Sequence, residues 1–275
     1  MDSLGVGAIN LADRPTRWEH IQQNWVRSGV LPQVQRLEAV RFPQRHRGCS
    51  LSHTLHALAY FDAHPDRDMY LIIEDDATPL RAPYSWRAEV SAMLADLTSI
   101  SNWKAVVLSP LVGPGLVRLR KHALSARLSV LEAGDNLSTA AILYHRRCVP
   151  HLRGWKQYYS TERRAYLVGI DRMMMRLPRD EVLLASMPLV EQRMTFPSDN
   201  PASFSQRIAI PAQNTSHNIL AAARDAPSAR VVNSVFFWAE ESAVLLFASF
   251  LCCALADALA AKRRALLYIY SPSPP

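Results

Sequence analysis

The stretch Met69-Tyr70-Leu71-Ile72-Ile73-Glu74-Asp75-Asp76-Ala77-Thr78-Pro79-Leu80 runs an apolar segment directly into three consecutive carboxylates. A short continuous apolar run is typical of a strand that is buried on both faces, as in parallel sheets. Ligands of open α/β sheets bind in the crevice beyond the carboxyl ends of such strands. We therefore expect a ligand site at residues 74–76.

The three acids repel one another unless a positive group lies among them. Hard divalent cations with oxygen ligands suit that role, and such ions also hold substrate phosphates. On an extended backbone Glu74 and Asp76 point to one side and Asp75 to the other, which gives an acid-x-acid spacing. The alternative interpretations are solvated acids at a strand end, or a helix N-cap at Asp76.

Length and composition indicate a globular chain. Its 275 residues allow one large α/β domain or two small ones, and 49% hydrophobic with 20% charged residues is not a disordered composition. The net charge is +7, but the chain has no long basic runs, and its aromatic residues are not interleaved with the short basic clusters. Nucleic acid is therefore not an expected partner. We expect the excess charge to lie on the solvated surface, where it attracts an anionic donor or acceptor.

The four cysteines are Cys49, Cys148 and the adjacent pair Cys252-Cys253. Nothing in their spacing resembles a zinc site, and adjacent cysteines rarely bridge each other, so a disulfide framework is not expected. The chain also opens without the pattern of a secretory signal. Together these features predict a cytoplasmic protein.

Strand-like and helix-like segments alternate along the chain. The alternation of strand-like and helix-like segments predicts a right-handed parallel α/β sheet. A basic loop is expected at 41–47, and a loop or hairpin at 111–120. The predicted strands cover 5–11, 34–39, 69–74, 103–108, 136–144 and 188–192, and the predicted helices cover 16–28, 48–61, 86–97, the segment after 145 and about 170–175.

Composition divides the chain into a main domain at 1–200, a polar linker or wrapping tail at 201–241 and an apolar helix with a basic tail at 242–275. Residues 242–261 approach the roughly 20 residues that span a bilayer. Asp257 would be costly there, and the basic residues that follow oppose the positive-inside rule for a cytosolic domain. A membrane anchor, a helix packed on the domain and an interfacial helix are all compatible with this segment.

Several segments together resemble glycosyltransferase family 25, which contains the lipopolysaccharide and collagen-type galactosyltransferases. The order and separations agree over about residues 5–200. The main matches are Ile9-Asn10-Leu11 with Arg14 and Arg17, Gly48-Cys49 with Ser52-His53, and Ile73 to Ala77; weaker matches are Ser138 to Ala141, Gly169 to Asp171, and Gln192 with Ser198-Asp199.

The resemblance implies a GT-A-like (Rossmann-like) fold and an inverting, metal-dependent transfer of a hexose, most often galactose. The donor would be a UDP-sugar, the cofactor Mn²⁺ or Mg²⁺, and the acceptor a glycan, a lipopolysaccharide-like molecule or a glycoprotein. By carry-over, Asp76 would bind the metal, and Glu74 and Asp75 would hold the donor's ribose and sugar or a second metal position. Asn10 and Arg14 would face the uridine, although Arg14 alone also fits a surface arginine beside a turn.

Two further roles follow from the resemblance. His53 would contact the donor, with a helix-packing histidine as the alternative. An inverting transfer also needs a general base for the acceptor hydroxyl. We select Asp171, an isolated acid at a strand-to-helix junction, with Asp199 as the second choice; a helix cap is the alternative for both.

Two other function classes compete with a glycosyltransferase. The first is a non-catalytic carbohydrate- or nucleotide-binding module of the same fold, which the costly acid triplet argues against. The second is another metal-dependent nucleotide enzyme, such as a nucleotidyltransferase. That class favours a glycine-rich phosphate loop, and the nine glycines of this chain form none.

Overall fold

The structure is a computed structural model that describes residues 4–193, with gaps at 44, 111–119, 124–128, 133–137, 162–168, 175, 179–180 and 186–187. Asp199 and the predicted segments 201–241 and 242–275 therefore lie outside the described residues. Within the described part of the chain, no helix combines the length and the apolar character needed to cross a membrane.

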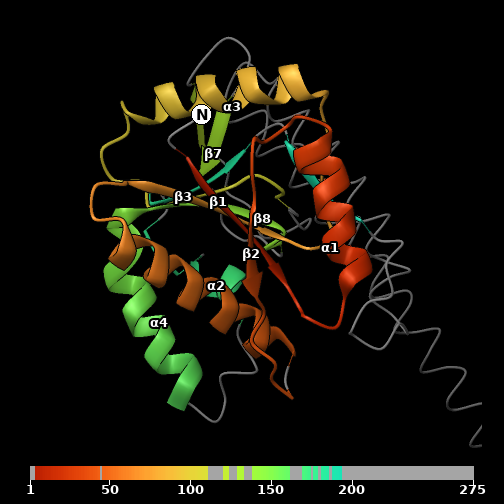
Figure 1. Cartoon of the computed structure of the whole chain (residues 1–275). Helices are drawn as coiled ribbons and strands as arrows, with labels where there is room; N and C mark the ends of the chain where they lie inside the picture. The colour runs from red at the N-terminus through yellow and green to blue at the C-terminus, as the bar shows by residue number, and fades with distance from the viewer. Residues whose placement is uncertain are drawn as a thin grey trace, which may run out of the picture.

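Ten strands form one large and one small sheet (Figure 1). The small sheet pairs β4 (Ala77–Pro79) with β10 (Val190–Gln192) in antiparallel fashion. The large sheet contains β1 (Gly5–Asn10), β2 (Gln35–Glu38), β3 (Met69–Glu74), β5 (Ala105–Val107), β6 (Arg120–Ala123), β7 (Ser129–Glu132), β8 (Ala141–His145) and β9 (Val182–Ala185).

The large sheet is mixed, with the strand order β2-β1-β3-β8-β5-β9-β7-β6. Strands β1, β2 and β3 are parallel, and so are β5 and β9. Strand β8 lies antiparallel between β3 and β5, and β7 lies antiparallel to both of its neighbours. Six of the eight strands described for this sheet thus point the same way, which confirms the expected mostly parallel α/β sheet. Strands β7 and β8 are the two antiparallel exceptions.

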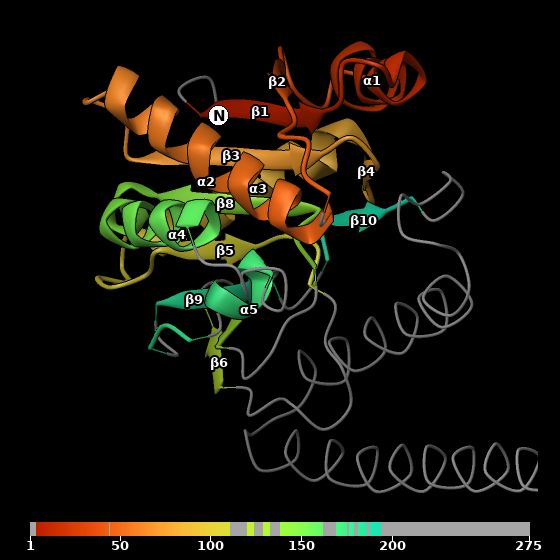
Figure 2. The ribbon, with the colours of Figure 1, turned by 90° about the horizontal axis from the view of Figure 1, so that it is seen from below.

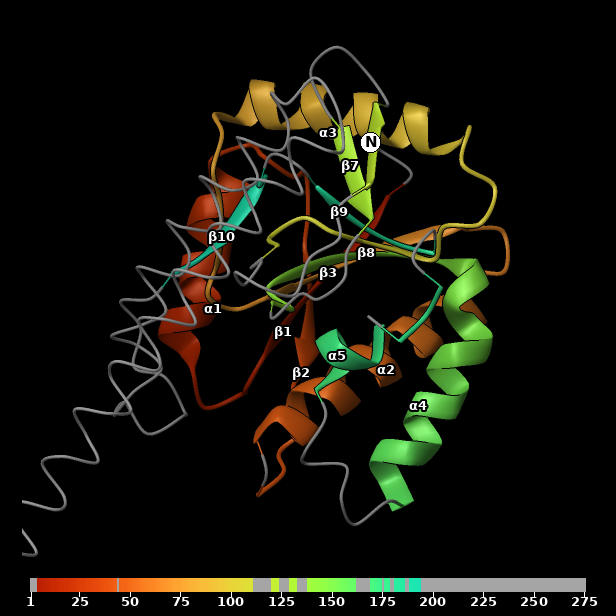
Figure 3. The ribbon, with the colours of Figure 1, turned by 180° about the vertical axis from the view of Figure 1, so that it is seen from behind.

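Helices cover both faces of the large sheet. Figures 1 and 3 show α3 on the opposite side from α2 and α4, and Figure 2 looks onto the face that α2 and α4 cover. The apolar side chains of α2, α4 and α5 share one core, and those of α1 and α3 share the other. The helices are α1 (Pro15–Ile21), which continues as a π-helical segment Gln22–Arg27, α2 (Arg45–Ala63), α3 (Pro83–Leu97), α4 (Val149–Thr161), which follows a 3₁₀ turn Arg146–Cys148, and α5 (Ile170–Met174).

Strand β3 explains the continuous apolar run that the sequence shows. Tyr70 and Ile72 enter the core beneath α2 and α4, whereas Leu71 and Ile73 enter the core beneath α3. All four side chains are at most 1% exposed. A central strand covered on both faces cannot alternate apolar with polar residues, so its period-2 pattern disappears.

Several element boundaries differ from the sequence prediction, among them the starts of α2 and β8. Helix α2 begins at Arg45, so the basic loop expected at 41–47 is shorter and Arg47 belongs to the helix. The strand expected at 136–144 begins only at Ala141. Basic residues near a helix start are unfavourable for the helix dipole, which is why the sequence alone placed the start at the next cap-like residue.

Gly48 allows the first turn of α2 to approach the chain that leaves β2. A Cβ atom at Gly48 would lie 2.5 Å from the carbonyl oxygen of Val40. Ser52 completes this contact, because its hydroxyl donates to the Gly48 carbonyl at 2.7 Å and accepts from the Val40 amide at 2.8 Å. The close approach fixes where α2 meets the end of the sheet.

We predict opposite effects for two glycine substitutions in helices. Gly48→Ala should lower the free energy of unfolding by about 1–3 kcal/mol, because backbone must move to admit the new methyl group. Gly154→Ala in α4, where nothing lies within 4 Å of the new Cβ, should raise it by about 0.5–1 kcal/mol, because alanine is the better helix former. Urea unfolding followed by circular dichroism measures both; equal effects of the two changes would contradict the close-contact role of Gly48.

Candidate functional site

A cavity of about 480 Å³ lies at the carboxyl ends of β1 and β3. Its described lining includes Asn10, Arg14, Arg17, Phe42, Cys49 and the acid triplet 74–76. These residues come from β1, the start of α1, the segment between β2 and α2, and the end of β3. The parallel arrangement of β1, β2 and β3 brings these chain ends to one edge of the sheet.

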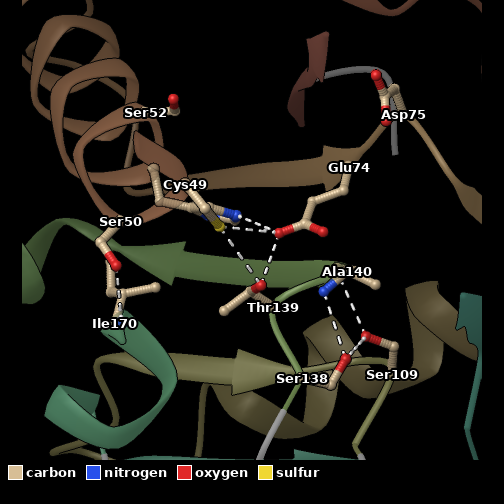
Figure 4. A network of polar contacts seen from close by, with 12 residues as sticks. Cys49, Ser50, Ser52, Glu74, Asp75, Ser109, Ser138, Thr139, Ala140 and Ile170 are labelled. Carbon is tan, nitrogen blue, oxygen red and sulfur yellow. Dashed lines mark hydrogen bonds and ion pairs between the residues drawn. The ribbon is translucent and has the colours of Figure 1, made fainter. Parts of the chain in front are cut away.

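The acid triplet does not continue the strand. Strand β3 ends at Glu74, and Asp75 and Asp76 lie in a turn before β4. The extended-chain alternation expected for these residues is therefore wrong beyond Glu74. Figure 4 shows the Glu74 carboxylate directed toward Cys49 and Thr139, and Asp75 turned away from them.

Arg17 of α1 is the positive group nearest to two of the acids. Its Nη1 atom lies 2.7 Å from Asp75 Oδ1 and 3.6 Å from Asp76 Oδ2, and the Arg17 side chain is only 11% exposed. Asn10 donates from Nδ2 to the other Asp75 oxygen at 2.8 Å. The protein thus provides its own positive charge beside Asp75. The sequence alone assigns that neutralising role to a divalent cation.

Asp76 is held differently, because one of its two oxygens has no hydrogen-bond partner among the described residues. Gln192 Nε2 donates to Oδ2 at 3.1 Å, and the Arg193 amide donates to the Asp76 carbonyl at 2.7 Å. Oδ1 is buried and accepts no hydrogen bond from the described residues. Burial, and then the charges of Glu74 and Asp75, raise the pKa of Asp76 to about 7. A buried carboxylate oxygen in this state is suited to binding a cation.

Glu74 faces a cluster on α2 and the start of β8. Thr139 Oγ1 donates to Glu74 Oε1 at 2.6 Å, and the Cys49 thiol donates to the same oxygen at 3.2 Å. His53 Nε2 lies 3.4 Å from it. Burial tends to raise the pKa of Glu74, but the contacts with His53, Thr139 and Cys49 outweigh it and hold the pKa below its usual value.

Asn10 and Arg14 both line the cavity but differ in their contacts. Asn10 is 1% exposed, and its Oδ1 accepts from Arg36 at 2.9 and 2.6 Å while its Nδ2 holds Asp75. Its side chain therefore links β1, β2 and the acidic turn. Burial, and then the neighbouring charge of Arg17, lower the pKa of Arg14. An arginine nevertheless stays charged at neutral pH.

Two tryptophans hold the chain at the two strands of the small sheet, one directly after the acidic turn and one directly before β10. Trp25 Nε1 donates to the Ala77 carbonyl at 2.9 Å, and Trp86 Nε1 donates to the Leu189 carbonyl at 3.1 Å. The two rings pack edge to face with centroids 5.4 Å apart. Because Leu189 precedes β10, this pair also positions the strand that carries Gln192 to Asp76.

The two candidate bases have different positions. Asp171 lies in the first turn of α5 and its carboxylate folds back over Gly169. The Ile170 amide is anchored to Ser50 of α2 at 3.0 Å, so this turn lies against the helix that carries Cys49. Asp171 is not among the described residues that line the cavity. Asp199 lies outside the described residues.

Three contacts in the site come from residues that the sequence did not single out as site residues: Arg17, Thr139 and Gln192. Each lies in or beside a segment that carries the family resemblance, so that resemblance could have indicated these residues as part of the site. Gln192 is 116 positions from Asp76, and Thr139 is 65 positions from Glu74. Contacts over such separations depend on how the sheet is assembled.

No protein-family model matches this chain, and no curated protein matches it. Several solved structures are similar to it over part of its length, and two of them follow. One is a glycosyltransferase involved in the glycosylation of the major capsid of PBCV-1, with a TM-score of 0.45 and 6% identity over 66% of this chain and 80% of that one. The other is mannose-1-phosphate geranyltransferase from Thermus thermophilus, with a TM-score of 0.38 and 12% identity over 66% of this chain and 73% of that one.

The raised pKa of Asp76 predicts a pH-dependent cost of burying its charge. Its pKa is 3.8 as a free side chain and about 7 in the fold. Between those values the folded state binds the proton and the unfolded state does not, so stability falls as pH rises through this window. Asp76→Asn should therefore be more stable than the parent at pH 8 by on the order of a few kcal/mol, and the difference should vanish near pH 4.

Thermal and urea unfolding of parent and Asp76→Asn at pH 4, 6 and 8 measure this difference. Asp75→Asn is the matched control, because it breaks a buried ion pair and should destabilise the protein at pH 8. A parent and an Asp76→Asn protein that respond identically to pH would contradict the assignment.

Proposed function

We propose that this chain is a metal-dependent inverting glycosyltransferase that moves a hexose, first of all galactose, from a UDP-sugar to a hydroxyl group of a glycan or glycoconjugate. The observation that carries the proposal is the buried Oδ1 of Asp76, which has no hydrogen-bond partner among the described residues and belongs to a residue that lines the cavity beyond the central strand. The cavity volume of about 480 Å³ lies in the usual range for small-molecule sites. Arg14 and Arg17 supply positive charge beside it.

The donor set beside the cavity fits a hard divalent cation. Asp76 would be its first ligand through Oδ1, and Glu74 is the second candidate, since the contacts described above all use Glu74 Oε1. A bound Mn²⁺ or Mg²⁺ supplies charge neutralisation for the diphosphate when the glycosidic C–O bond breaks. We assign no other role to this ion.

The remaining residues position the donor. Each oxygen of Asp75 already accepts one bond, from Arg17 or Asn10, and each has a second lone pair for a ribose or sugar hydroxyl. The fixed charge of Arg14 is placed to meet the diphosphate at the start of α1. Asn10 holds Asp75 in orientation and exposes little of itself, which favours a positioning role over uridine contact.

The transfer itself needs a base on the acceptor side. The acceptor O–H bond breaks, its proton goes to a carboxylate, the new C–O bond forms at the anomeric carbon and UDP leaves on the opposite face. Asp171 is the first candidate for this carboxylate, and Asp199 is the second. The proximity of the α5 turn to Cys49 supports a place for Asp171 on the α2 side of the acid triplet.

The Arg17–Asp75 ion pair favours one competing function, a non-catalytic nucleotide- or carbohydrate-binding module. The triplet is costly only if its charges are uncompensated, and Arg17 compensates part of them without a metal. Release of UDP from UDP-sugars with and without Mn²⁺ separates the two functions. A binding module would bind the donor but release no UDP, and a nucleotidyltransferase would release a different product.

We predict that Asp76→Ala abolishes Mn²⁺-dependent binding of UDP-galactose, because it removes the oxygen assigned to the cation. Isothermal titration with and without Mn²⁺ measures this, and circular dichroism checks that the fold is retained. Asp62→Ala, on the 65% exposed acid of α2, is the matched control and should leave binding unchanged. Hexose transfer that is insensitive to a chelator, or normal turnover by Asp76→Ala, would contradict the proposal.

We predict that Asp171→Asn lowers kcat by about 10²–10⁴-fold while donor affinity changes little, because the amide cannot accept the acceptor's proton. Steady-state kinetics at saturating donor and a separate donor titration provide the two readouts. The assignment fails if the loss appears in donor binding, or if Asp199→Asn reproduces the kinetic defect and Asp171→Asn does not.

A further inference from the structure

Three side chains of different chemistry converge beside the cavity: Cys49, His53 and Glu74. One ligand-type atom of each, a sulfur, a ring nitrogen and a carboxylate oxygen, all lie within 4.8 Å of one another. Cys49 and His53 are four residues apart on α2, so they lie on one face of that helix. That face meets the end of β3, where Glu74 is the last strand residue.

His53 shows that this cluster is incomplete as a hydrogen-bond network. The residue is fully buried, and its Nε2 has no hydrogen-bond partner among the described residues. The nearest acceptor described for it, Glu74 Oε1, lies 3.4 Å away and already accepts two bonds. A buried, unpartnered ring nitrogen costs free energy unless another group satisfies it.

Tyr144 fixes the orientation of the imidazole ring. Its hydroxyl lies 3.2 Å from His53 Nδ1. When Nδ1 carries the proton and donates it to Tyr144, the lone pair of Nε2 is directed at Cys49 and Glu74. A hydrogen bond to the second ring nitrogen is the usual support of a metal-binding histidine.

The separations fit a small tetrahedral ion. Zinc bonds of about 2.0–2.3 Å at tetrahedral angles place two ligand atoms about 3.3–3.6 Å apart. The distance from Glu74 Oε1 is 3.2 Å to Cys49 Sγ and 3.4 Å to His53 Nε2. Both separations lie close to that range, and the ligand atoms of Cys49 and His53 lie within 4.8 Å of each other. A thiolate and an imidazole favour zinc-like ions over Mg²⁺ or Mn²⁺.

We propose that Cys49, His53 and Glu74 form a binding site for a zinc-like metal ion. This site uses the Oε1 atom of Glu74 and no atom of Asp76, so it differs from the oxygen-ligand site assigned to Asp76, which would share Glu74 only through its other carboxylate oxygen. Cys49 and Glu74 line the cavity, so an ion would enter the site from there. This site does not depend on the proposed transferase function. The expectation drawn from the sequence considered cysteine spacing alone, and a site of one cysteine, one histidine and one glutamate lies outside it.

Binding is a proton-for-metal exchange without redox change. The Cys49 S–H bond breaks, a sulfur–metal bond forms and the proton passes to solvent. Burial, and then the charge of Glu74, raise the pKa of Cys49 well above its usual value, so the thiol keeps its proton when no ion is present. The thiolate forms only with the metal. A cation here would also offset the Glu74 charge that raises the pKa of Asp76.

Cobalt titration of the chelator-stripped full chain tests the proposal, because Co²⁺ bound to a thiolate gives a charge-transfer band in the near ultraviolet. The parent should show this band, an equimolar amount of Zn²⁺ should remove it, and excess Mg²⁺ should not. Cys49→Ser should abolish it. Cys148→Ser is the matched control, since Cys148 is also a buried free cysteine, and it should keep the band.

The proposal is overturned if the parent gives no band, or if Cys49→Ser keeps the parental band. If circular dichroism shows that Cys49→Ser does not fold, His53→Gln serves as the test in its place. This substitution should weaken Co²⁺ binding by about tenfold or more, and an unchanged Co²⁺ affinity would overturn the proposed site. Asp76→Asn should keep the band, so failure of this metal site and failure of the Mn²⁺-dependent donor site give different results.

Discussion

The buried ion pair between Arg17 and Asp75 is the interaction on which the rest of the site depends. Three consecutive carboxylates at the end of a doubly buried strand cannot all be desolvated and charged without compensation. Arg17 neutralises the middle acid at 2.7 Å, and Asn10 attaches the same acid to β1. Because Asn10 also accepts from Arg36 of β2, one chain of contacts joins α1, β1, β2 and the acidic turn.

The ion pair separates three adjacent acids into three environments. Glu74 ends the strand and faces Cys49 and His53. Asp75 is satisfied within the protein and orients a carboxylate toward the cavity. Asp76 keeps one buried oxygen without a partner among the described residues. Neighbouring residues of the same chemical type therefore suit different tasks, a zinc-like cluster, a hydroxyl contact and a hard cation, because the turn after Glu74 directs them apart.

Such a turn needs rigid support, since an unpaired buried oxygen favours any rearrangement that would hydrate it. Trp25 and Trp86 supply that support from the core beneath α1 and α3, through hydrogen bonds to the chain on both sides of the small sheet. Gly48 supplies it from the other core by letting α2 approach the chain after β2. The site thus lies where the two cores meet, and packing on both faces of the sheet determines its geometry.

The sequence by itself determined the local features: a continuous apolar run that must be a doubly buried strand, the helices that cover it, and acids placed just beyond its end. These depend on periodicity and on neighbours a few positions away. Only the tertiary structure decided that β8 runs antiparallel beside β3, that Arg17 reaches Asp75, that Gln192 reaches Asp76, and that Glu74 faces Cys49 and His53. Strand order and direction are set by the packing of the whole sheet, so residues up to 116 positions apart meet, and no local pattern encodes which of them will.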